Sequence, residues 1–274
     1  MVRLLPLLLL APLLGCTRLF FQPDRWLHHA PQVLKVRFEP VRFASADGTM
    51  LSGYWFPSTG TALGTVVHFH GNGQNVTSHY TLSYWLAAEG FNVFAFDYRG
   101  YGDSEGVPGM KGAVQDGAAA LRWASEKPGV DAAKLAVFGQ SLGAALGLAA
   151  IQESGLPVRA VVLEGSFLTY RSIGRAVLRK NVITWPFQWL PYLVVTGRRT
   201  PAEMVRRLPP CRLLFVHGED DEIVPLSEGQ RLFALAPEPK SFLRTPGGHL
   251  DAFSTYRSMY GAKLTAFLKE AMLP

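Results

Sequence analysis

The 274-residue sequence predicts an α/β fold built on a mostly parallel sheet of about eight strands. From Gly64 onward, short apolar runs of strand length alternate with longer segments that have helical periodicity. Runs that are apolar throughout are typical of parallel strands, because helices cover both faces of such a sheet. Hydrophobic residues make up 48% of the chain and charged residues 18%. This composition excludes a disordered protein, and the length allows one large domain with a full core.

The sheet is expected to begin with an antiparallel edge. Residues 33–38 and 41–43 alternate apolar and polar side chains, and Asp47-Gly48 marks a hairpin turn into a strand over 51–56. The parallel strands are expected at 65–69, 91–96, 135–138, 160–163, 212–216 and 241–244. Helices are expected between and after them at 78–89, 111–126, 142–153, 226–236 and 252–272.

One insertion interrupts this alternation. Residues 166–207 are predicted to form a helical cap, and residues 41–165 and 208–274 to form the core. The cap segment holds eight basic residues and one acid, an excess of +7, whereas the whole chain carries +6. The positive charge is therefore local, and without a basic helix or nucleic-acid motif it argues against nucleic-acid binding. The arginines of the cap form a solvated face or meet anionic lipid head groups or an acidic substrate. Its aromatic residues line an acyl pocket or form a small core of the cap itself; these are Phe167, Tyr170, Trp185, Phe187 and Trp189.

The N-terminus has the order of an export signal. A charged Arg3 precedes the apolar run 4–14, which is shorter than the roughly 20 residues that span a bilayer. Leu13-Leu-Gly-Cys16 resembles a bacterial lipobox, which implies cleavage after residue 15 and a lipid on Cys16. We therefore expect an exported lipoprotein, anchored to a membrane of a bacterial cell envelope; an ordinary secretory signal or an uncleaved anchor is the alternative. Residues 16–40 are predicted to be a tether whose aromatics lie at a membrane surface or cover the domain. Cys211, left without a partner, is expected to be a buried apolar residue.

The strongest candidate for chemistry is Ser141. It lies at the centre of Gly139-Gln-Ser-Leu-Gly143, between an apolar strand and a helix rich in small residues, which is the pattern of a nucleophile elbow. Only glycine tolerates the crowding on either side of such a strained turn. The following helix N-terminus places N–H groups where an oxyanion would form.

A serine needs a base and an acid, which follow such an elbow in the order Ser, Asp/Glu, His. Of the seven histidines only His217 and His249 come after Ser141. His249 is predicted to be the base, because it lies in a flexible Pro-Gly-Gly-His loop after the last strand. The acid is predicted to be Asp221, in a loop after the preceding strand, with Glu164 as the rival.

An oxyanion hole needs two N–H donors. The amide of Leu142 supplies one, and Asn72 of the loop His70-Gly-Asn-Gly73 is predicted to supply the other through its main-chain N–H or its side chain. His70 precedes the serine and is predicted to be a structural hydrogen-bonding residue. No metal or cofactor is expected, since no Cys/His cluster has ligand spacing.

Five motifs coincide in this sequence: His70–Gly73, Asp97–Gly106, Gly139–Gly143, His217–Pro225 and Gly247–His249. Together they resemble the α/β-hydrolase superfamily, nearest to its serine aminopeptidase-like and monoacylglycerol lipase-like group, over roughly residues 41–274. The resemblance implies a Ser141–Asp221–His249 triad with Asn72 and Leu142 at the oxyanion hole, and a structural turn at Asp97–Gly106. We thus expect a serine hydrolase that cleaves small-molecule acyl esters, of the carboxylesterase or lipase type. An aminopeptidase or amidase, or a non-catalytic envelope lipoprotein, is the alternative.

Overall fold

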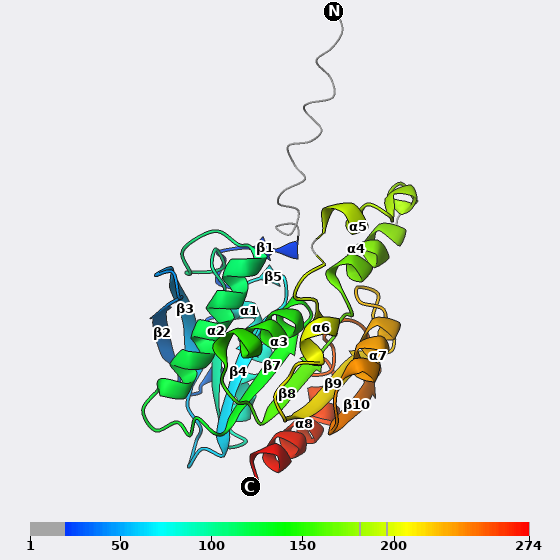
Figure 1. The fold of residues 1–274 in the computed structure, drawn as a ribbon. Coiled ribbons are helices and arrows are strands. Elements are labelled where there is room, and N and C mark those ends of the chain that lie inside the picture. The colour runs from blue at the N-terminus through cyan, green and yellow to red at the C-terminus, as the bar shows by residue number, and fades with distance from the viewer. Residues whose placement is uncertain (1–19, 181, 196, 274) are drawn as a thin grey trace, which may run out of the picture.

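A computed structural model describes residues 20–180, 182–195 and 197–273. Its main element is an eight-stranded sheet in the order β10-β9-β8-β7-β4-β6-β3-β2 (Figure 1). The edge strands β2 and β3 are antiparallel, and all other neighbours from β6 to β10 run parallel. The predicted fold class is therefore confirmed, with a mixed sheet. Its strands are β2 (Glu39–Ala44), β3 (Met50–Phe56), β4 (Gly64–Phe69), β6 (Phe91–Phe96), β7 (Leu135–Gln140), β8 (Ala160–Glu164), β9 (Arg212–Gly218) and β10 (Lys240–Thr245).

Alternate residues of the central strands point into two separate apolar cores. Val67, Val137 and Val161 belong to the core under α2 (Met110–Glu126), α3 (Leu142–Ser154) and α7 (Leu226–Leu235). Val66, Ala136 and Val162 belong to the core under α8 (Arg257–Met272) and the turns of residues 80–87. The period of two along each strand thus explains why the apolar runs of the sequence are continuous.

Two elements at the start of the core differ from the prediction. Residues 33–38 are not a strand: Pro31–Leu34 form the 3₁₀ helix η2, and Lys35 ends it in a left-handed conformation at φ 53°. Residues 78–89 are not one helix but three short pieces, α1 (Val76–His79), η3 (Tyr80–Leu82) and η4 (Tyr84–Ala87). Ser83 breaks this segment at φ −136°. Its hydroxyl makes a 2.8 Å hydrogen bond with Nδ1 of the buried His68.

Residues 20–29, which we call the N-terminal strap, lie against the domain. Gln22–Pro23 form β1, which pairs in parallel with β5 (Gly73–Gln74) directly after the predicted oxyanion loop. Phe21 is buried against the ring of Tyr101. Phe21 therefore covers the domain, which is one of the two roles left open for the aromatic residues of this region. Cys16 lies outside the described residues.

The predicted cap is only partly helical. It contains α4 (Tyr170–Arg179), the 3₁₀ turn η5 (Trp185–Phe187), α5 (Pro191–Val194) and α6 (Pro201–Val205). Helices α4 and α5 project from one end of the sheet (Figure 1), whereas α6 packs against α3 and α7 and buries Met204 and Val205. We reserve the name cap for α4–α5. No described helix is long and apolar enough to cross a membrane.

Candidate active site

The predicted site residues gather where five neighbouring parallel strands end. Ser141 follows β7, Asp221 follows β9 and His249 follows β10, while the loop with Asn72 follows β4. Carboxyl ends of parallel strands meet at one edge of a sheet, where open α/β sheets bind their ligands. The order of the strands therefore brings together side chains that are up to 177 positions apart in the sequence, from Asn72 to His249.

Ser141 has the strained backbone of a nucleophile elbow. Its φ of 52° and ψ of −116° place a non-glycine residue in a sparsely populated region. Its N–H donates to the carbonyl of Glu164 at 2.8 Å, which ties the turn to β8. A Cβ at Gly143 would lie 2.1 Å from the carbonyl oxygen of Phe69, and one at Gly139 would lie 2.6 Å from Cα of Ala144. Backbone on both sides therefore excludes any larger residue.

His249 is held by Asp221. Its Nδ1 lies 2.7 Å from Oδ2 of Asp221, whose side chain is fully buried. The other oxygen, Oδ1, accepts from the N–H groups of Ile223 and Val224 at 2.9 and 2.8 Å. A carboxylate in this setting is an acceptor, so Nδ1 of His249 is the donor and Nε2 keeps a lone pair.

His217 lies next to Asp221 and holds the loop that carries it. Its Nε2 donates to the carbonyl of Val224 at 2.9 Å and lies 3.5 Å from Oδ2 of Asp221. Burial lowers the pKa of His217. This histidine therefore serves as a buried neutral support of the Asp221 loop, and His249 is the histidine that faces outward.

Glu164-Gly165 connects the serine to the histidine. The carbonyl of Glu164 accepts from the N–H of Ser141. The ring of His249 lies so close to Gly165 that a Cβ there would be 2.8 Å from Cε1 of the imidazole. The backbone of Ser141 and the ring of His249 thus border the same dipeptide at the end of β8.

Glu164 itself takes part in a different network. Its Oε2 accepts from Nε2 of Gln140 at 2.6 Å, and Oε1 of Gln140 accepts from Nε2 of His68 at 2.8 Å. The chain continues from His68 to the hydroxyl of Ser83. Burial raises the pKa of Glu164 to about 7 and lowers that of His68 to about 3. The hydrogen bond between His249 and an acid goes to Asp221, and Glu164 lies in the buried layer beneath the elbow.

The loop His70–Gly73 has all four of its carbonyl groups engaged. They accept, in order, from the hydroxyl of Tyr98 at 3.1 Å, from Nδ1 of His70 at 2.8 Å, from the hydroxyl of Tyr101 at 2.7 Å and from Nε2 of His79 at 3.2 Å. The carbonyl of Asn72 also accepts from the N–H of Gln22 in the strap, at 2.9 Å. His70 is thus a structural hydrogen-bonding residue, as predicted. The hydrogen bonds to these carbonyl groups fix the orientation of the peptide planes in this loop.

Sequence reasoning missed four residues that hold this loop: Gln22, His79, Tyr98 and Tyr101. Tyr101 lies in the Asp97–Gly106 motif, whose turn was predicted to be structural, and Gln22 lies in the predicted tether. No motif marks either residue as a neighbour of Asn72. The contact of Gln22 depends on how the strap crosses the domain, which local sequence does not encode.

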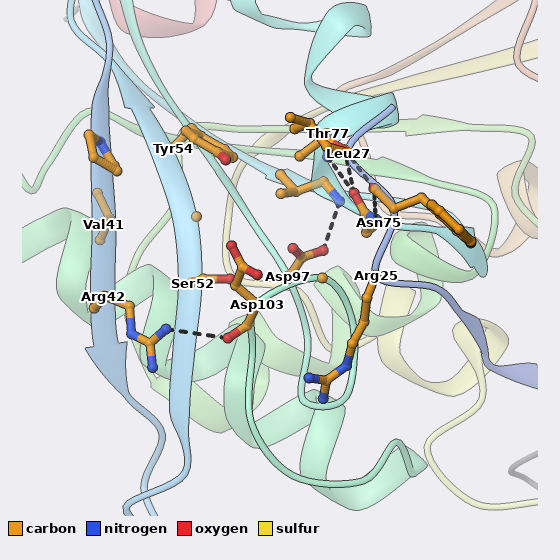
Figure 2. Close-up of a pocket in the computed structure, with 15 residues that line it drawn as sticks. Arg25, Leu27, Val41, Arg42, Ser52, Tyr54, Asn75, Thr77, Asp97 and Asp103 are labelled. Carbon is orange, nitrogen blue, oxygen red and sulfur yellow. Dashed lines mark hydrogen bonds between the residues drawn. The ribbon is translucent and has the colours of Figure 1, made fainter. Parts of the chain in front are cut away.

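One cavity of about 280 Å³ lies under the strap, away from Ser141 (Figure 2). Asp97 lies at its centre, Arg25 and Leu27 of the strap border it on one side, and Ser52 and Tyr54 of β3 border it on the other. Asp221, His249, Ser141 and Leu142 do not line it. This cavity is therefore separate from the candidate active site. In the described part of the chain no group of three or more His, Cys, Asp or Glu residues could hold a metal.

The aromatic residues of segment 166–207 have two different environments. Phe167 and Tyr170 are buried and contact each other edge to face. Trp185, Phe187 and Trp189 are each at least half exposed. The first pair is part of the main core, and the other three belong to neither apolar core of the described residues.

Cys211 is buried, as expected, and burial raises the pKa of its thiol to about 11.

Comparisons with known proteins agree with this architecture. A family model described as serine aminopeptidase, S33, matches residues 60–209. The uncharacterised protein YfhR of Escherichia coli O157:H7 is 34% identical over 243 residues, which cover 86% of this chain and 82% of YfhR. The lysophosphatidylserine lipase ABHD12 of Danio rerio is 29% identical over 219 residues, which cover 76% of this chain and 56% of that protein.

Among solved structures, the Pyrococcus furiosus esterase Pf2001 superposes with a TM-score of 0.76 at 19% identity, covering 93% of this chain and 99% of the esterase. Acetyl xylan esterase 1 of Thermoanaerobacterium superposes with a TM-score of 0.65 at 22% identity, covering 91% and 88% of the two chains. Both likenesses show the fold. With the family match over more than half of the sequence, they lead to one conclusion: the chain is an α/β hydrolase and belongs to the serine aminopeptidase S33 family.

Proposed function

We propose that this protein is a serine hydrolase that cleaves carboxylic esters through an acyl-enzyme on Ser141. The observation that carries the proposal is the 2.7 Å hydrogen bond between Asp221 and His249, whose ring lies beside the dipeptide that also holds Ser141. A buried acid that orients a histidine is one half of the unit in which an acid, a histidine and a serine act together, and this supports the proposal.

In the proposed reaction Oγ of Ser141 attacks the ester carbonyl while Nε2 of His249 takes the hydroxyl proton. Asp221 holds the imidazole in the tautomer that leaves Nε2 free, and it stabilises the imidazolium that forms. The N–H groups of Leu142 and Asn72 stabilise the oxyanion, each contributing roughly 3–4 kcal/mol to lowering the barrier. When the tetrahedral intermediate collapses, the ester C–O bond breaks and the alcohol leaves with the proton from His249.

Deacylation repeats these steps with water in place of the serine hydroxyl. A water molecule gives a proton to Nε2 of His249 and attacks the acyl-enzyme carbonyl. The bond to Oγ of Ser141 then breaks, the carboxylic acid leaves and the serine regains its proton. Ser141, His249 and Asp221, with the N–H groups of Leu142 and Asn72, are the groups that we assign to these steps.

An ester substrate fits the charge near the site better than a substrate with a free amine. An aminopeptidase needs an acid to bind the substrate amine, whereas the segment 166–207 is strongly basic. The names of ABHD12 and Pf2001, a lipase and an esterase, also favour ester cleavage. The family description keeps aminopeptidase activity as the second candidate.

Steady-state hydrolysis tests the proposal. The wild type should hydrolyse p-nitrophenyl esters of graded chain length, and Ser141→Ala should lose at least about 10⁴-fold in kcat. Amino-acid p-nitroanilides measure the amidase alternative in parallel. Faster turnover of the anilides would reverse the order of the two candidates, and no turnover of either substrate by the wild type would support the non-catalytic alternative.

We also propose that Cys16 carries a lipid and that the mature protein is anchored to a membrane of a bacterial cell envelope. The support is the order of charged residue, apolar run and Leu-Leu-Gly-Cys in the first 16 residues. Intact-mass measurement of the protein from its native membrane tests this. A mature chain that begins at Cys16 with added acyl mass is expected, and an unmodified cysteine would contradict it.

A further inference from the structure

We propose that the outer surface of the cap docks on a bilayer that contains anionic lipids. The cap surface is formed by exposed apolar side chains between α4 and the end of α5, among them Val182, Trp185, Phe187, Trp189, Tyr192 and Leu193. The proposal concerns where the protein binds and is independent of its catalytic chemistry.

The cap leaves a large apolar surface exposed to water. Val182 is 89% exposed and Leu193 is 72% exposed, and two tryptophans are more than half exposed. Soluble monomers rarely gather so many large apolar side chains within a dozen residues unless the surface binds something. Tryptophan and tyrosine also favour the interface of a bilayer, where the ring is in an apolar layer and its polar atom is in contact with water.

The cap also carries a row of positive charges along α4. Arg171, Arg175 and Arg179 follow one another at intervals of four along α4, so they share one face of that helix, and Lys180 follows. Within the described residues none of the four forms an ion pair with an acid. Exposed aromatics beside a row of cations are the composition of helices that lie in a lipid interface, where the cations are attracted to anionic head groups. A second copy of this chain would present the same positive charge.

The first described residue of the N-terminal strap contacts the cap. The ring of Phe20 contacts the ring of Tyr170, the first residue of α4, at 5.8 Å. Only residues 17–19 separate Phe20 from Cys16, so a lipid on Cys16 would lie within about 14 Å of Phe20 even along an extended chain. The base of the cap is thus the part of the domain next to the expected anchor.

Vesicle sedimentation tests this surface without the lipid. The protein is the chain from residue 16 onward, which keeps every described residue, with Cys16→Ser. We expect it to bind vesicles containing phosphatidylglycerol and to bind pure phosphatidylcholine weakly. Replacing Trp185, Phe187 and Trp189 by serine should weaken binding at least about tenfold, because binding scales with buried apolar area. Replacing Arg175, Arg179 and Lys180 by glutamine should cost about fivefold for each charge.

A matched control replaces three exposed apolar residues of the core domain, Val107, Met259 and Leu273, by serine. This control should bind vesicles like the parent. Equal binding by the control and both cap variants, or no binding by the parent, would overturn the proposal. A concentration-dependent dimer in sedimentation velocity that the aromatic substitutions abolish, without vesicle binding, would assign the surface to a second copy and also overturn it.

A separate set of contacts leads to a second inference: we infer that Tyr101 and the strap position the oxyanion loop for catalysis. The hydroxyl of Tyr101 donates to the carbonyl of Asn72 at 2.7 Å and accepts from the N–H of Gln22 at 3.2 Å. The N–H of Gln22 also reaches the carbonyl of Asn72. The tyrosine hydroxyl therefore joins the strap to the residue predicted to bind the oxyanion.

The strap is fixed further along by its own side chains. Oδ1 of Asp24 accepts from the side-chain amide of Asn75 at 2.6 Å and from Nε2 of His28 at 3.1 Å. In Figure 2 Asn75 lies next to Thr77 of α1 and next to Leu27 of the strap. Because β1 and β5 pair directly after Asn72, movement of the strap is transmitted to the loop. A misplaced donor costs rate without costing substrate affinity.

This inference rests on the proposed ester hydrolysis, and its test separates the two. Tyr101→Phe should lower kcat about tenfold, normalised to sites titrated by a fluorophosphonate, with KM within about twofold. Gln22→Pro, which removes the N–H, should behave alike, whereas Gln22→Ala keeps the N–H and should match the wild type. Tyr80→Phe, which loses a bond from its hydroxyl to the carbonyl of His29 at the far end of the strap, is the structural control.

A purely structural role would lower the number of titrated sites and leave kcat per site unchanged. That result, or wild-type kcat in both Tyr101→Phe and Gln22→Pro, would overturn the positioning role. Absence of turnover in the wild type would instead refute the proposed function itself.

Discussion

The residues beneath Ser141 and those of the cap differ in burial, hydrogen bonding and backbone conformation. Beneath the serine, a buried chain of polar groups runs from Ser83 to Glu164, and glycines allow neighbouring backbone segments to pack in direct contact. In the cap, large aromatic side chains are exposed and short helical pieces follow one another. At Gly139 and Gly143 neighbouring backbone leaves no room for a Cβ, whereas the large side chains of the cap extend into solvent.

The largest expected effect tests the acid that holds His249. Asp221→Asn should lower kcat about 10⁴-fold, because an amide stabilises the wrong imidazole tautomer. Glu164→Gln is the matched control: Glu164 binds Gln140, and the variant should retain turnover within about tenfold at pH 7. Steady-state ester hydrolysis compares the two variants. If Glu164→Gln were the more damaging of the two, the catalytic acid would have to be reassigned.

A smaller effect tests how tightly the backbone is packed at the elbow. Gly143→Ala should lower the free energy of unfolding by about 3 kcal/mol, because the new Cβ would meet the carbonyl oxygen of Phe69 at 2.1 Å. Gly60→Ala, with nothing within 4 Å of its Cβ, should change it by less than about 0.5 kcal/mol. Urea unfolding measures both. Equal stability of the two variants would show that the elbow can relax.

A further effect on stability is the pH dependence that comes from Glu164. Burial raises its pKa from 4.5 to about 7. Between these values the folded protein keeps a proton that the unfolded chain has lost, so stability falls as pH rises, by about 3 kcal/mol in total.

Glu164→Gln cannot ionise, so its stability relative to the wild type should increase from pH 4.5 to pH 7 and then level off. His68 and His79, whose pKa values burial lowers to about 3, contribute equally to both proteins and cancel in the difference. Urea unfolding across this range measures the difference, and a constant value would mean that Glu164 is ionised throughout.

The sequence predicted the sheet and the elbow because their signals are local. A continuous apolar run identifies a buried strand, and Gly139–Gly143 lies between a strand and a helix. The pairing of Asp221 with His249 followed from chain order and loop position, since loops after adjacent parallel strands must meet. These predictions needed no knowledge of distant contacts.

The parts that failed depend on tertiary contacts. Residues 33–38 have the alternation of a strand, but Pro31 and the left-handed Lys35 favour a 3₁₀ turn and no described strand pairs with them. Residues 78–89 have helical composition, but the hydroxyl of Ser83 is drawn to His68. For the predicted tether the sequence left two roles open, a membrane surface or a cover of the domain, because the pairing of β1 with β5 depends on where residues 20–29 cross the fold.

Covalent labelling of Ser141 tests the central claim most directly. The protein is treated with a fluorophosphonate, its intact mass is measured and the modified peptide is sequenced. We expect one adduct per chain, on the peptide that contains Gly139–Gly143, with no adduct in Ser141→Ala and strongly slowed labelling in His249→Ala. A wild-type protein that stays unlabelled, or that carries its adduct on another serine, would contradict it.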